Sequence, residues 1–422
     1  MKRKMMKLFS RGLKRSFDHY VTLDIGSEFI KALTVEIGDN KVGSVLGVGV
    51  KKHTLGDMQS NAITDINNII QNANEAILKA NKMAGIQPEQ ILLGIAGELV
   101  IGKTISLTFK RPDQTEKLDQ TELENIIHKV QWKAFEQLRA EIAYETGFNE
   151  IDIKLINAAI IDIAVDGYPV KNPIGFQGKE VELTLFNAFS PIVHYGAIQT
   201  IVAELNLELL AITAEPYALA KTLLEKPKEE KADAIIIDVG SSTTDIVLIK
   251  DNSLMGTKMF SLGGRIFTKR LAQSLNVSFV EAEEIKMAYG SEQLEKQSHK
   301  IVREAILDDA QIWLSGIKLS LSEFADNESL PSQILLCGGG SMLPEIKEAL
   351  ETREWSKKLP FPKKPIVGFL DEKDITNIKD KTKSLNSPQM ITPLALANIG
   401  LELAREEKLL NKILKKVIRL MA

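Results

Sequence analysis

The feature that most constrains this chain is a short pattern that occurs twice, each time between two apolar, strand-like runs. The first copy reads Asp-Ile-Gly-Ser at residues 24–27, and the second reads Asp-Val-Gly-Ser at residues 238–241. An Asp-Asn pair typical of a further turn follows each copy, at residues 39–40 and 251–252. The repetition predicts two similar α/β halves that face one cleft, and clefts of this kind are common ligand sites.

Both turns have the composition of a phosphate-binding loop. Turns rich in glycine, serine and threonine expose successive backbone N–H groups, which form a concavity for anions. The carboxylates of Asp24 and Asp238 would repel bare phosphate, but they suit a hydrated Mg²⁺, which prefers carboxylate and water oxygens. Either turn alone could be an ordinary hairpin turn, whereas the matched pair favours a phosphate site. We expect phosphate contacts from Gly26, Ser27, Gly240, Ser241, Ser242 and Thr243.

Two other segments predict a pocket for the rest of a nucleotide. An apolar strand at residues 334–337 runs into a glycine-rich turn, where the backbone can approach a flat ligand closely or simply connect two elements. The capping-box pattern at residues 278–281 starts a helix on which Glu283 and Lys286 share one face. This pair could hold a ribose and a base, or it could be a solvated ion pair. The glycine-rich turn consists of Gly338, Gly339, Gly340 and Ser341.

Composition excludes several classes of protein. The formal net charge is −3, so no overall positive field favours nucleic acid, and we expect no nucleic-acid partner. Cys337 is the only cysteine, which forbids an internal disulfide and a cysteine-based zinc cluster and favours a reducing compartment. No run of about 18 apolar residues occurs, so no membrane-spanning helix is expected. These features predict a cytoplasmic protein.

Basic charge is concentrated in the first and last fifteen residues, which carry seven and five Lys or Arg residues and no acid. In residues 404–422 apolar side chains recur along one face of a helix and cations fill the rest. This pattern is typical of a helix that lies in an anionic membrane surface, although such a helix could also pack on the protein's own core. The side chains expected to enter the membrane are Leu410, Ile413, Leu414, Val417, Ile418 and Met421.

These elements, in this order, resemble the ATP-binding motifs of the actin/Hsp70/sugar-kinase superfamily. Residues 21–27 and 235–247 look like its two phosphate motifs, and residues 334–344 look like its adenosine motif. Glu215 opens a stretch that resembles the first connecting helix, and Thr392 opens one that resembles the second. The likeness covers nearly the whole chain.

Within that superfamily, three stretches are similar to FtsA, the bacterial cell-division actin. They are residues 167–178, residues 262–290 and the basic helix at residues 404–422. The pilus-assembly actin PilM is a near neighbour that shares the first loop and the inserted domain. A sugar or metabolite kinase and an Hsp70-like chaperone are further alternatives. The basic helix argues against the kinase, and the absence of a large domain after the match argues against the chaperone.

The resemblance implies an α/β fold: a duplicated actin-like ATPase with a small inserted α/β domain and a C-terminal amphipathic helix. The first half would be split by the insert and would resume after it, and the second half would follow as one block. The implied boundaries are a basic tail at 1–19, the first half at 20–102 and 192–230, the insert at 103–191, the second half at 231–403 and the helix at 404–422.

The resemblance also implies roles for single residues. ATP with Mg²⁺ would be the ligand, with Asp24 and Asp238 positioning the metal and its waters. Glu215 would orient an attacking water, so that it and Asp238 would be the catalytic residues of an enzyme with weak ATPase activity at most. Glu283 and Lys286 would bind ribose and adenine, and the glycine-rich turn at residues 338–341 would cover the adenosine.

Implied partners are the tubulin-like protein FtsZ or another division protein, further copies of the chain in a head-to-tail filament, and the inner face of the cell membrane. Three departures from the FtsA pattern bear on these roles. Ser241 and Ser242 replace glycines and narrow the backbone approach to phosphate. Glu28 is unfavourable near phosphate unless its carboxylate points away. Acids at residues 308–309 stand where FtsA often carries an arginine for FtsZ.

Overall fold

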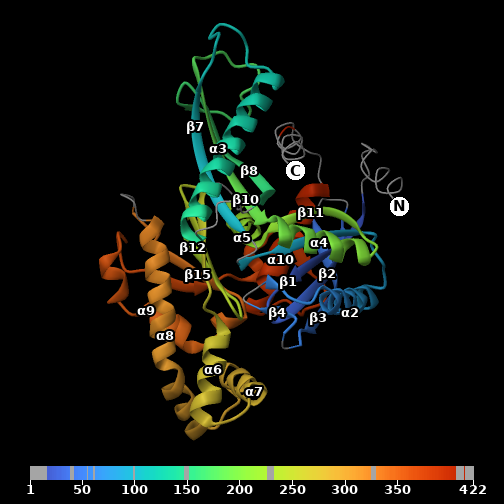
Figure 1. The fold of residues 1–422 in the computed structure, drawn as a ribbon, viewed down its shortest axis with the longest axis vertical. Coiled ribbons are helices and arrows are strands. Elements are labelled where there is room, and N and C mark those ends of the chain that lie inside the picture. Colours follow the sequence, from blue (N-terminus) through green and yellow to red (C-terminus); the bar gives the residue numbers. More distant parts are fainter. Residues whose placement is uncertain are drawn as a thin grey trace.

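The computed structural model describes most of the chain, which forms two halves built on sheets and a projecting insert (Figure 1). One half contains β1 to β3 and α2, and the other contains β12, β15 and α6 to α9. The insert, drawn in cyan to green, projects at the end opposite to α6 and α7. The described residues are 17–38, 42–54, 56–59, 62–97, 100–146, 152–225, 232–324, 329–404 and 413.

The first half is a mixed sheet whose strands run in the order β11-β6-β1-β2-β3-β17. Helix α2 packs so closely on β3 that a side chain at Gly49 would collide with the backbone oxygen of Ala76. Asp65 caps the start of this helix by accepting from the backbone N–H of Asn68, and Gly85 ends it at φ 71°. The bounds are β1 His19–Ile25, β2 Phe29–Ile37, β3 Gly43–Lys52, β4 Met58–Gln59, β5 Ala62–Ile63, α2 Ile66–Ala84, β6 Gln90–Ile95, α4 Ile192–Glu204, β11 Glu208–Ala214 and β17 Ile378–Asp380.

The second half repeats this plan. In each half an antiparallel meander of three strands (β1-β2-β3 and β12-β13-β14) is extended by a strand parallel to its first member, β6 in one and β15 in the other. The duplication predicted from the two hairpins is therefore confirmed. The bounds are β12 Ala234–Val239, β13 Thr244–Lys250, β14 Ser253–Phe260, α6 Gly264–Leu275, α7 Phe279–Gly290, α8 Lys296–Phe324, β15 Gln333–Cys337, α9 Pro344–Glu351 and β16 Ile366–Phe369, with short 3₁₀ helices at Gly339–Met342, Trp355–Lys358, Glu372–Asp374 and Pro388–Met390.

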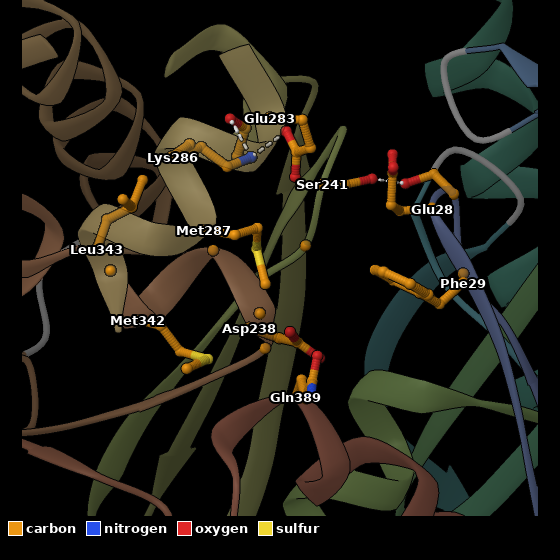
Figure 2. Close-up of a pocket in the computed structure, with 18 of the residues that line it drawn as sticks. Glu28, Phe29, Asp238, Ser241, Glu283, Lys286, Met287, Met342, Leu343 and Gln389 are labelled. Carbon is orange, nitrogen blue, oxygen red and sulfur yellow. Dashed lines mark hydrogen bonds and ion pairs between the residues drawn. The ribbon is translucent and has the colours of Figure 1, made fainter. Parts of the chain in front are cut away.

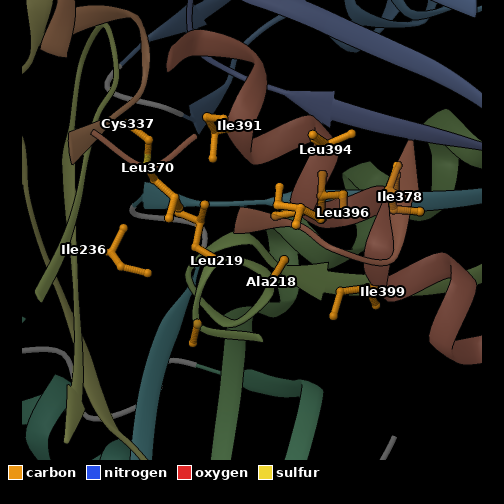
Figure 3. Packing of buried hydrophobic residues seen from close by; sticks show 14 of the residues in the cluster. Ala218, Leu219, Ile236, Cys337, Leu370, Ile378, Ile391, Leu394, Leu396 and Ile399 are labelled. Carbon is orange, nitrogen blue, oxygen red and sulfur yellow. The ribbon is translucent and has the colours of Figure 1, made fainter. Parts of the chain in front are cut away.

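Two helices, α5 (Glu215–Leu224) and α10 (Ile391–Ala404), connect the halves and share one hydrophobic core (Figure 3). Leu219 of α5 and Leu396 of α10 pack with Ile236 and Cys337, which belong to the sheet of the second half. All four side chains are fully buried. Because burying such a side chain stabilises by about 1.5–3 kcal/mol, this core holds the two halves in register.

The insert is a four-stranded antiparallel sheet in the order β7-β10-β8-β9, packed against helix α3. Asp119 accepts from the backbone N–H of Glu122 and so caps α3. The insert also touches the second half, where Thr104 donates to the carbonyl of Leu254 at 3.1 Å. The bounds are β7 Ile101–Lys110, α3 Gln120–Thr146, β8 Ile153–Val165, β9 Tyr168–Pro169 and β10 Glu180–Pro191.

Residues 359–381 contain two strands, β16 and β17, although the prolines and charges there interrupt any periodic pattern and predict irregular structure. Both are short strands at sheet edges, held by parallel backbone pairing with β15 and β3. Backbone pairing of this kind leaves little trace in side-chain alternation.

Of the helices in the described part of the chain, none has the length and apolar character to span a membrane.

Candidate functional site

The two predicted turns are built in the same way. In the first, the N–H of Gly26 donates to the carbonyl of Phe29 at 3.1 Å, and in the second that of Gly240 donates to Thr243 at 2.9 Å. Each turn closes an antiparallel hairpin at the end of the central strand of its half. The hairpin register sets Asp24 opposite Lys31 in one case and Asp238 opposite Asp245 in the other.

The two turns meet across the molecule. The Oγ atoms of Ser27 and Ser241 lie 2.5 Å apart, although 214 residues separate them in sequence. Beside this contact is a cavity of about 450 Å³ lined by both halves (Figure 2), within the usual range of small-molecule sites, roughly 300–1,000 Å³. The predicted residues that line it are Asp24, Gly26, Ser27, Glu215, Asp238, Gly240, Ser241, Thr243, Glu283, Lys286, Gly338, Gly339 and Gly340.

Buried carboxylates gather at one side of the cavity. Asp24 Oδ2 accepts from Lys31 Nζ at 2.8 Å, and Asp238 Oδ2 accepts from Thr392 Oγ1 at 2.7 Å. Glu215, the first residue of α5, lies in the same cluster and is 6% exposed. Within the part of the chain that the structure describes, its Oε1 atom has no hydrogen-bond partner. A buried polar atom in that state calls for a water or another ligand.

The electrostatics of this cluster follow from burial and like charge. Burial, and then the neighbouring Asp24 and Asp238, raise the pKa of Glu215 well above its usual range. Burial likewise raises the pKa of Asp238, and burial with the charge of Asp238 raises that of Asp245 to about 7. Burial alone would lower the pKa of Lys31, but Asp24 and the other acids outweigh this and raise it. The cluster therefore carries more negative charge than its one lysine balances.

This donor set fits magnesium. Mg²⁺ usually keeps several waters and binds through one or two carboxylates together with substrate phosphates. Asp24 and Asp238 provide such carboxylates beside both phosphate-type turns, and the unpartnered Oε1 of Glu215 can accept from a metal-bound water. A divalent cation would also compensate the burial and the like charge that raise the pKa of Asp238 and Glu215.

The opposite end of the cavity is more apolar. Met287 of α7 and Met342, which follows the glycine-rich turn, point into it, and Leu343 also lines it (Figure 2). At its edge the Lys286 Nζ contacts Glu283 Oε2 at 2.7 Å, so the two predicted residues form an ion pair that faces the cavity. The capping box that positions them is present at the start of α7.

The glycine-rich turn passes directly behind the carboxylates. Gly338 has φ 81°, and a side chain there would collide with the carboxylate of Asp238, so both its conformation and its surroundings require glycine. Two predicted residues do not line the cavity. Ser341 is buried and donates from Oγ to the carbonyl of Gly338 at 2.7 Å, which ties the turn together. Ser242 lies beyond the cavity lining in the second turn.

Sequence reasoning missed several charged residues in and beside the cavity. Lys31 and Asp245 each follow an already predicted aspartate by seven residues, and this repeated spacing is the signal that could have found them. Lys52 and Arg265 have no comparable signal, because both act through Glu28. Only the folded chain brings those residues to one place.

Most of the predicted membrane-facing residues lie outside the described residues. Ile413 is described, and it is 1% exposed within the hydrophobic cluster of the insert. It packs on protein in this structure, as an apolar side chain away from lipid does on any apolar surface it can reach. Its contact with a membrane stays a prediction. The residues outside the described part are Leu410, Leu414, Val417, Ile418 and Met421.

The model of the family described as "Cell division protein FtsA" matches residues 235–395. The chain is 25% identical over 349 residues to the cell division protein FtsA of Enterococcus hirae, covering 78% of this chain and 74% of that protein. It is 25% identical over 366 residues to FtsA of Enterococcus faecalis, covering 81% and 78%. By sequence, the predicted resemblance to FtsA cell-division proteins is confirmed.

Among solved structures, a chain of a "PilM-PilN type IV pilus biogenesis complex" superposes with a TM-score of 0.67 at 18% identity. The superposition covers 92% of this chain and 99% of that one. At that identity the likeness concerns the fold. It confirms the predicted duplicated actin-like α/β architecture and the prediction that PilM has a similar structure.

Proposed function

We propose that this chain, from its likeness to FtsA, is an actin-like cell-division protein that binds ATP with Mg²⁺ between its two halves. The observation that carries the proposal is the meeting of two matched hairpin turns beside a shared cluster of buried carboxylates. Each turn alone is an ordinary hairpin, whereas the pair around one cavity forms a site that a polyphosphate with its metal would fill.

The roles at the site follow from the chemistry of each group. The N–H groups and hydroxyls of the turns at residues 26–27 and 240–243 bind phosphate oxygens, and Lys31 supplies a positive charge. Asp24 and Asp238 hold the hydrated Mg²⁺, which when bound would neutralise part of the phosphate charge. Glu283 and Lys286 hold the nucleoside beside the turn at residues 338–341. None of these roles requires the protein to form a covalent bond.

Glu215 is the residue that would orient a water for hydrolysis. Among the described residues, one oxygen of its buried carboxylate has no hydrogen-bond partner and can accept from a water. Burial, and then Asp24 and Asp238, raise the pKa of Glu215, so its carboxylate is a stronger base than an exposed one. Phosphoryl transfer depends mainly on positioning and charge neutralisation. The two serines of the second turn narrow the approach, so we expect slow turnover and a nucleotide that mainly controls assembly.

The insert would be the contact between successive copies of the chain. A head-to-tail contact that does not close generates a filament, and the insert projects from one end of the molecule (Figure 1). The partner would be FtsZ or another division protein. Asp309, in the region where FtsA often carries an arginine, is held in place by a two-pronged ion pair with Arg270, so we expect this chain to bind its partner through other residues.

Residues 404–422 would anchor the protein to the cytoplasmic face of the cell membrane. Apolar burial and attraction of the cations to anionic lipid act together in such a helix, with about 1 kcal/mol for each cation near the surface. Filament formation would strengthen the attachment, because many weak anchors act together.

The test is sedimentation and negative-stain microscopy with ATP on anionic vesicles. We expect filaments on the vesicles, and we expect Leu414→Glu with Ile418→Glu to abolish pelleting. Asn411→Glu, which adds a negative charge off the apolar stripe, is the matched control and should pellet with little loss. Equal pelleting of all variants would contradict the anchor, and filaments that persist without the insert would contradict its role in assembly.

A PilM-like role in pilus assembly is the second candidate, favoured by the superposition on a chain of the PilM-PilN complex. Such a protein would bind a peptide of a membrane partner and would need no lipid-binding helix of its own. Vesicle binding by the purified chain alone therefore separates the two candidates.

A further inference from the structure

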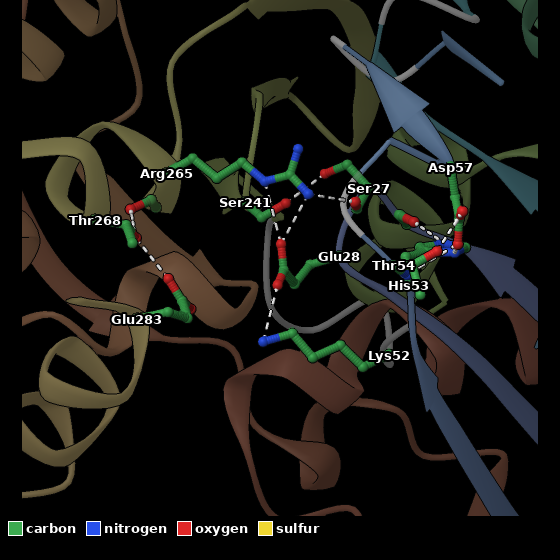
Figure 4. Close-up of polar contacts among 12 residues, drawn as sticks. Ser27, Glu28, Lys52, His53, Thr54, Asp57, Ser241, Arg265, Thr268 and Glu283 are labelled. Carbon is green, nitrogen blue, oxygen red and sulfur yellow. Dashed lines mark hydrogen bonds and ion pairs between the residues drawn. The ribbon is translucent and has the colours of Figure 1, made fainter. Parts of the chain in front are cut away.

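Glu28 is the one acid within the turns at residues 26–29 and 240–243, and it contacts Arg265 of the opposite half of the molecule. It stands two residues after Gly26, where the second turn has Ser242. Its Oε2 accepts from Arg265 at 3.1 Å (Nε) and 2.9 Å (Nη2), and its Oε1 lies 3.2 Å from Lys52 Nζ (Figure 4). The Glu28 side chain is 13% exposed. Although burial opposes it, the two cations lower the pKa of Glu28.

Arg265 joins the two turns. Its backbone N–H donates to the carbonyl of Ser241 at 2.8 Å, so the start of α6 is fixed to the second turn. Its guanidinium donates to the carbonyl of Ser27 at 2.9 Å as well as to Glu28, so the same residue is fixed to the first turn. The clasp formed by Glu28, Arg265 and Lys52 therefore closes the gap between the turns.

The closed gap has no room for a phosphate between the serines. Their hydroxyls touch each other, at 2.5 Å. A phosphate oxygen that accepted from both would need the two Oγ atoms on the order of 4 to 5 Å apart, given ordinary O–H···O lengths. A polyphosphate that uses both turns must therefore separate them, and the clasp must open.

The charges of the clasp show what opens it. A phosphate in this place repels the carboxylate of Glu28 and attracts Arg265 and Lys52. Arginine binds phosphate through two parallel hydrogen bonds as readily as it binds carboxylate. In this structure Glu28 thus forms ion pairs with two cations that could instead bind a phosphate.

We propose that Arg265 and Lys52 are phosphate ligands of the cleft, and that Glu28 is an internal anion that holds them until a nucleoside polyphosphate displaces it. The inference rests on the proposed nucleotide site and goes beyond it. Arg265 and Lys52 become two further phosphate ligands. Glu28 lowers the affinity for nucleotide and keeps the cleft closed until the nucleotide binds.

The experiment compares ATP affinity by calorimetry with Mg²⁺ for the wild-type chain and for Glu28→Gln, which keeps the hydrogen-bonding shape and removes the charge. We expect Glu28→Gln to bind ATP about tenfold more tightly, which corresponds to about 1.4 kcal/mol. Glu75→Gln removes the same charge from a surface ion pair with Lys51 and should leave the affinity unchanged.

Arg265→Gln shows whether Arg265 binds phosphate or only holds the two turns together, because this change removes both the contact with Glu28 and the proposed phosphate ligand. If Arg265 is a phosphate ligand, this variant binds ATP at least several-fold more weakly than the wild type, and Lys52→Gln weakens binding to a smaller extent. Tighter binding by Arg265→Gln, in parallel with Glu28→Gln, would overturn the assignment of Arg265.

Tripolyphosphate provides a probe of the phosphate end alone, and it should show the same order of affinities as ATP. Equal ATP affinity of Glu28→Gln and the wild type would overturn this inference and leave the proposed function standing. No ATP binding by either chain would overturn both. Circular dichroism and the urea midpoint establish that each variant is folded.

Discussion

The hairpins β1–β2 and β12–β13 share their backbone and differ in their charges. Both have the same turn hydrogen bond, and both place a second charged residue opposite the aspartate that precedes the turn, seven residues later. That residue is Lys31 in the first hairpin and Asp245 in the second. The two hairpins therefore share a backbone framework but contribute opposite charges to the carboxylate cluster of the cavity: one adds a lysine and the other a further acid.

The first carbonyl group of each turn also has a different hydrogen-bond donor. The carbonyl of Gly240 accepts from the backbone N–H of Gly264 at 2.9 Å, so the start of α6 holds the second turn. The carbonyl of Gly26 lies 3.0 Å from Nε2 of the buried His53, whose backbone N–H also donates to Glu28 at 2.9 Å. The Gly26 carbonyl is thus held by a histidine side chain, whereas the Gly240 carbonyl is held by a backbone N–H group.

Lys31→Met should give the largest effect on stability. It leaves the acids around Lys31 without their buried cation, and breaking a buried ion pair costs about 3–5 kcal/mol. Urea denaturation at pH 8 without nucleotide measures the free energy of unfolding. Lys51→Met is the matched control, because the Lys51–Glu75 pair is a surface pair, and such pairs contribute at most about 1 kcal/mol. Similar losses in both variants would show that Lys31 does not balance the cluster.

Asp245→Asn should act in the opposite direction and stabilise the chain at pH 8. The folded-state pKa of Asp245 is raised to about 7, mainly by burial, so the unfolded chain releases this proton first as pH rises from about 4. Charging it therefore costs stability progressively up to about pH 7, by up to about 4 kcal/mol at about 1.4 kcal/mol per pKa unit. The gain from Asp245→Asn should be largest at pH 8 and small at pH 4. A gain that does not depend on pH would contradict this.

His53→Ala should give the smallest effect and a local one. It removes a buried partner of the Gly26 carbonyl and of the Asn72 side chain, which costs about 1–3 kcal/mol. Amide hydrogen exchange should accelerate at residues 26–31 and stay unchanged at residues 240–245. His53→Gln, which can still donate to Gly26, should restore part of the protection. Equal acceleration in both hairpins would show that the turns are not supported separately.

The sequence predicts those parts of the molecule that depend on local pattern. The two turns and the capping box at Ser278 follow from neighbouring residues, and the structure has them. Lys31 and Asp245 were within reach through the repeated spacing of seven, which has meaning only once a hairpin register is assumed. The partnership of Glu28 with Arg265, 237 residues away, depends on the docking of two halves and leaves no local signal.

Strands β16 and β17 show the same limit in the fold. Each is at most four residues long and is set by backbone pairing with an existing strand. Ser341 shows it in the site, because a serine in a glycine-rich turn looks like a ligand donor until its hydroxyl is seen to bond Gly338. What the sequence misses is therefore what contacts distant in the chain decide.

Isothermal titration calorimetry of the wild-type chain with ATP shows whether the two hairpins form one nucleotide site. We expect saturable binding of one ATP per chain that depends on Mg²⁺ and is lost in both Asp24→Ala and Asp238→Ala, since either hairpin alone is insufficient. Absence of ATP and ADP binding at millimolar nucleotide would contradict it, and so would binding that survives the loss of either aspartate.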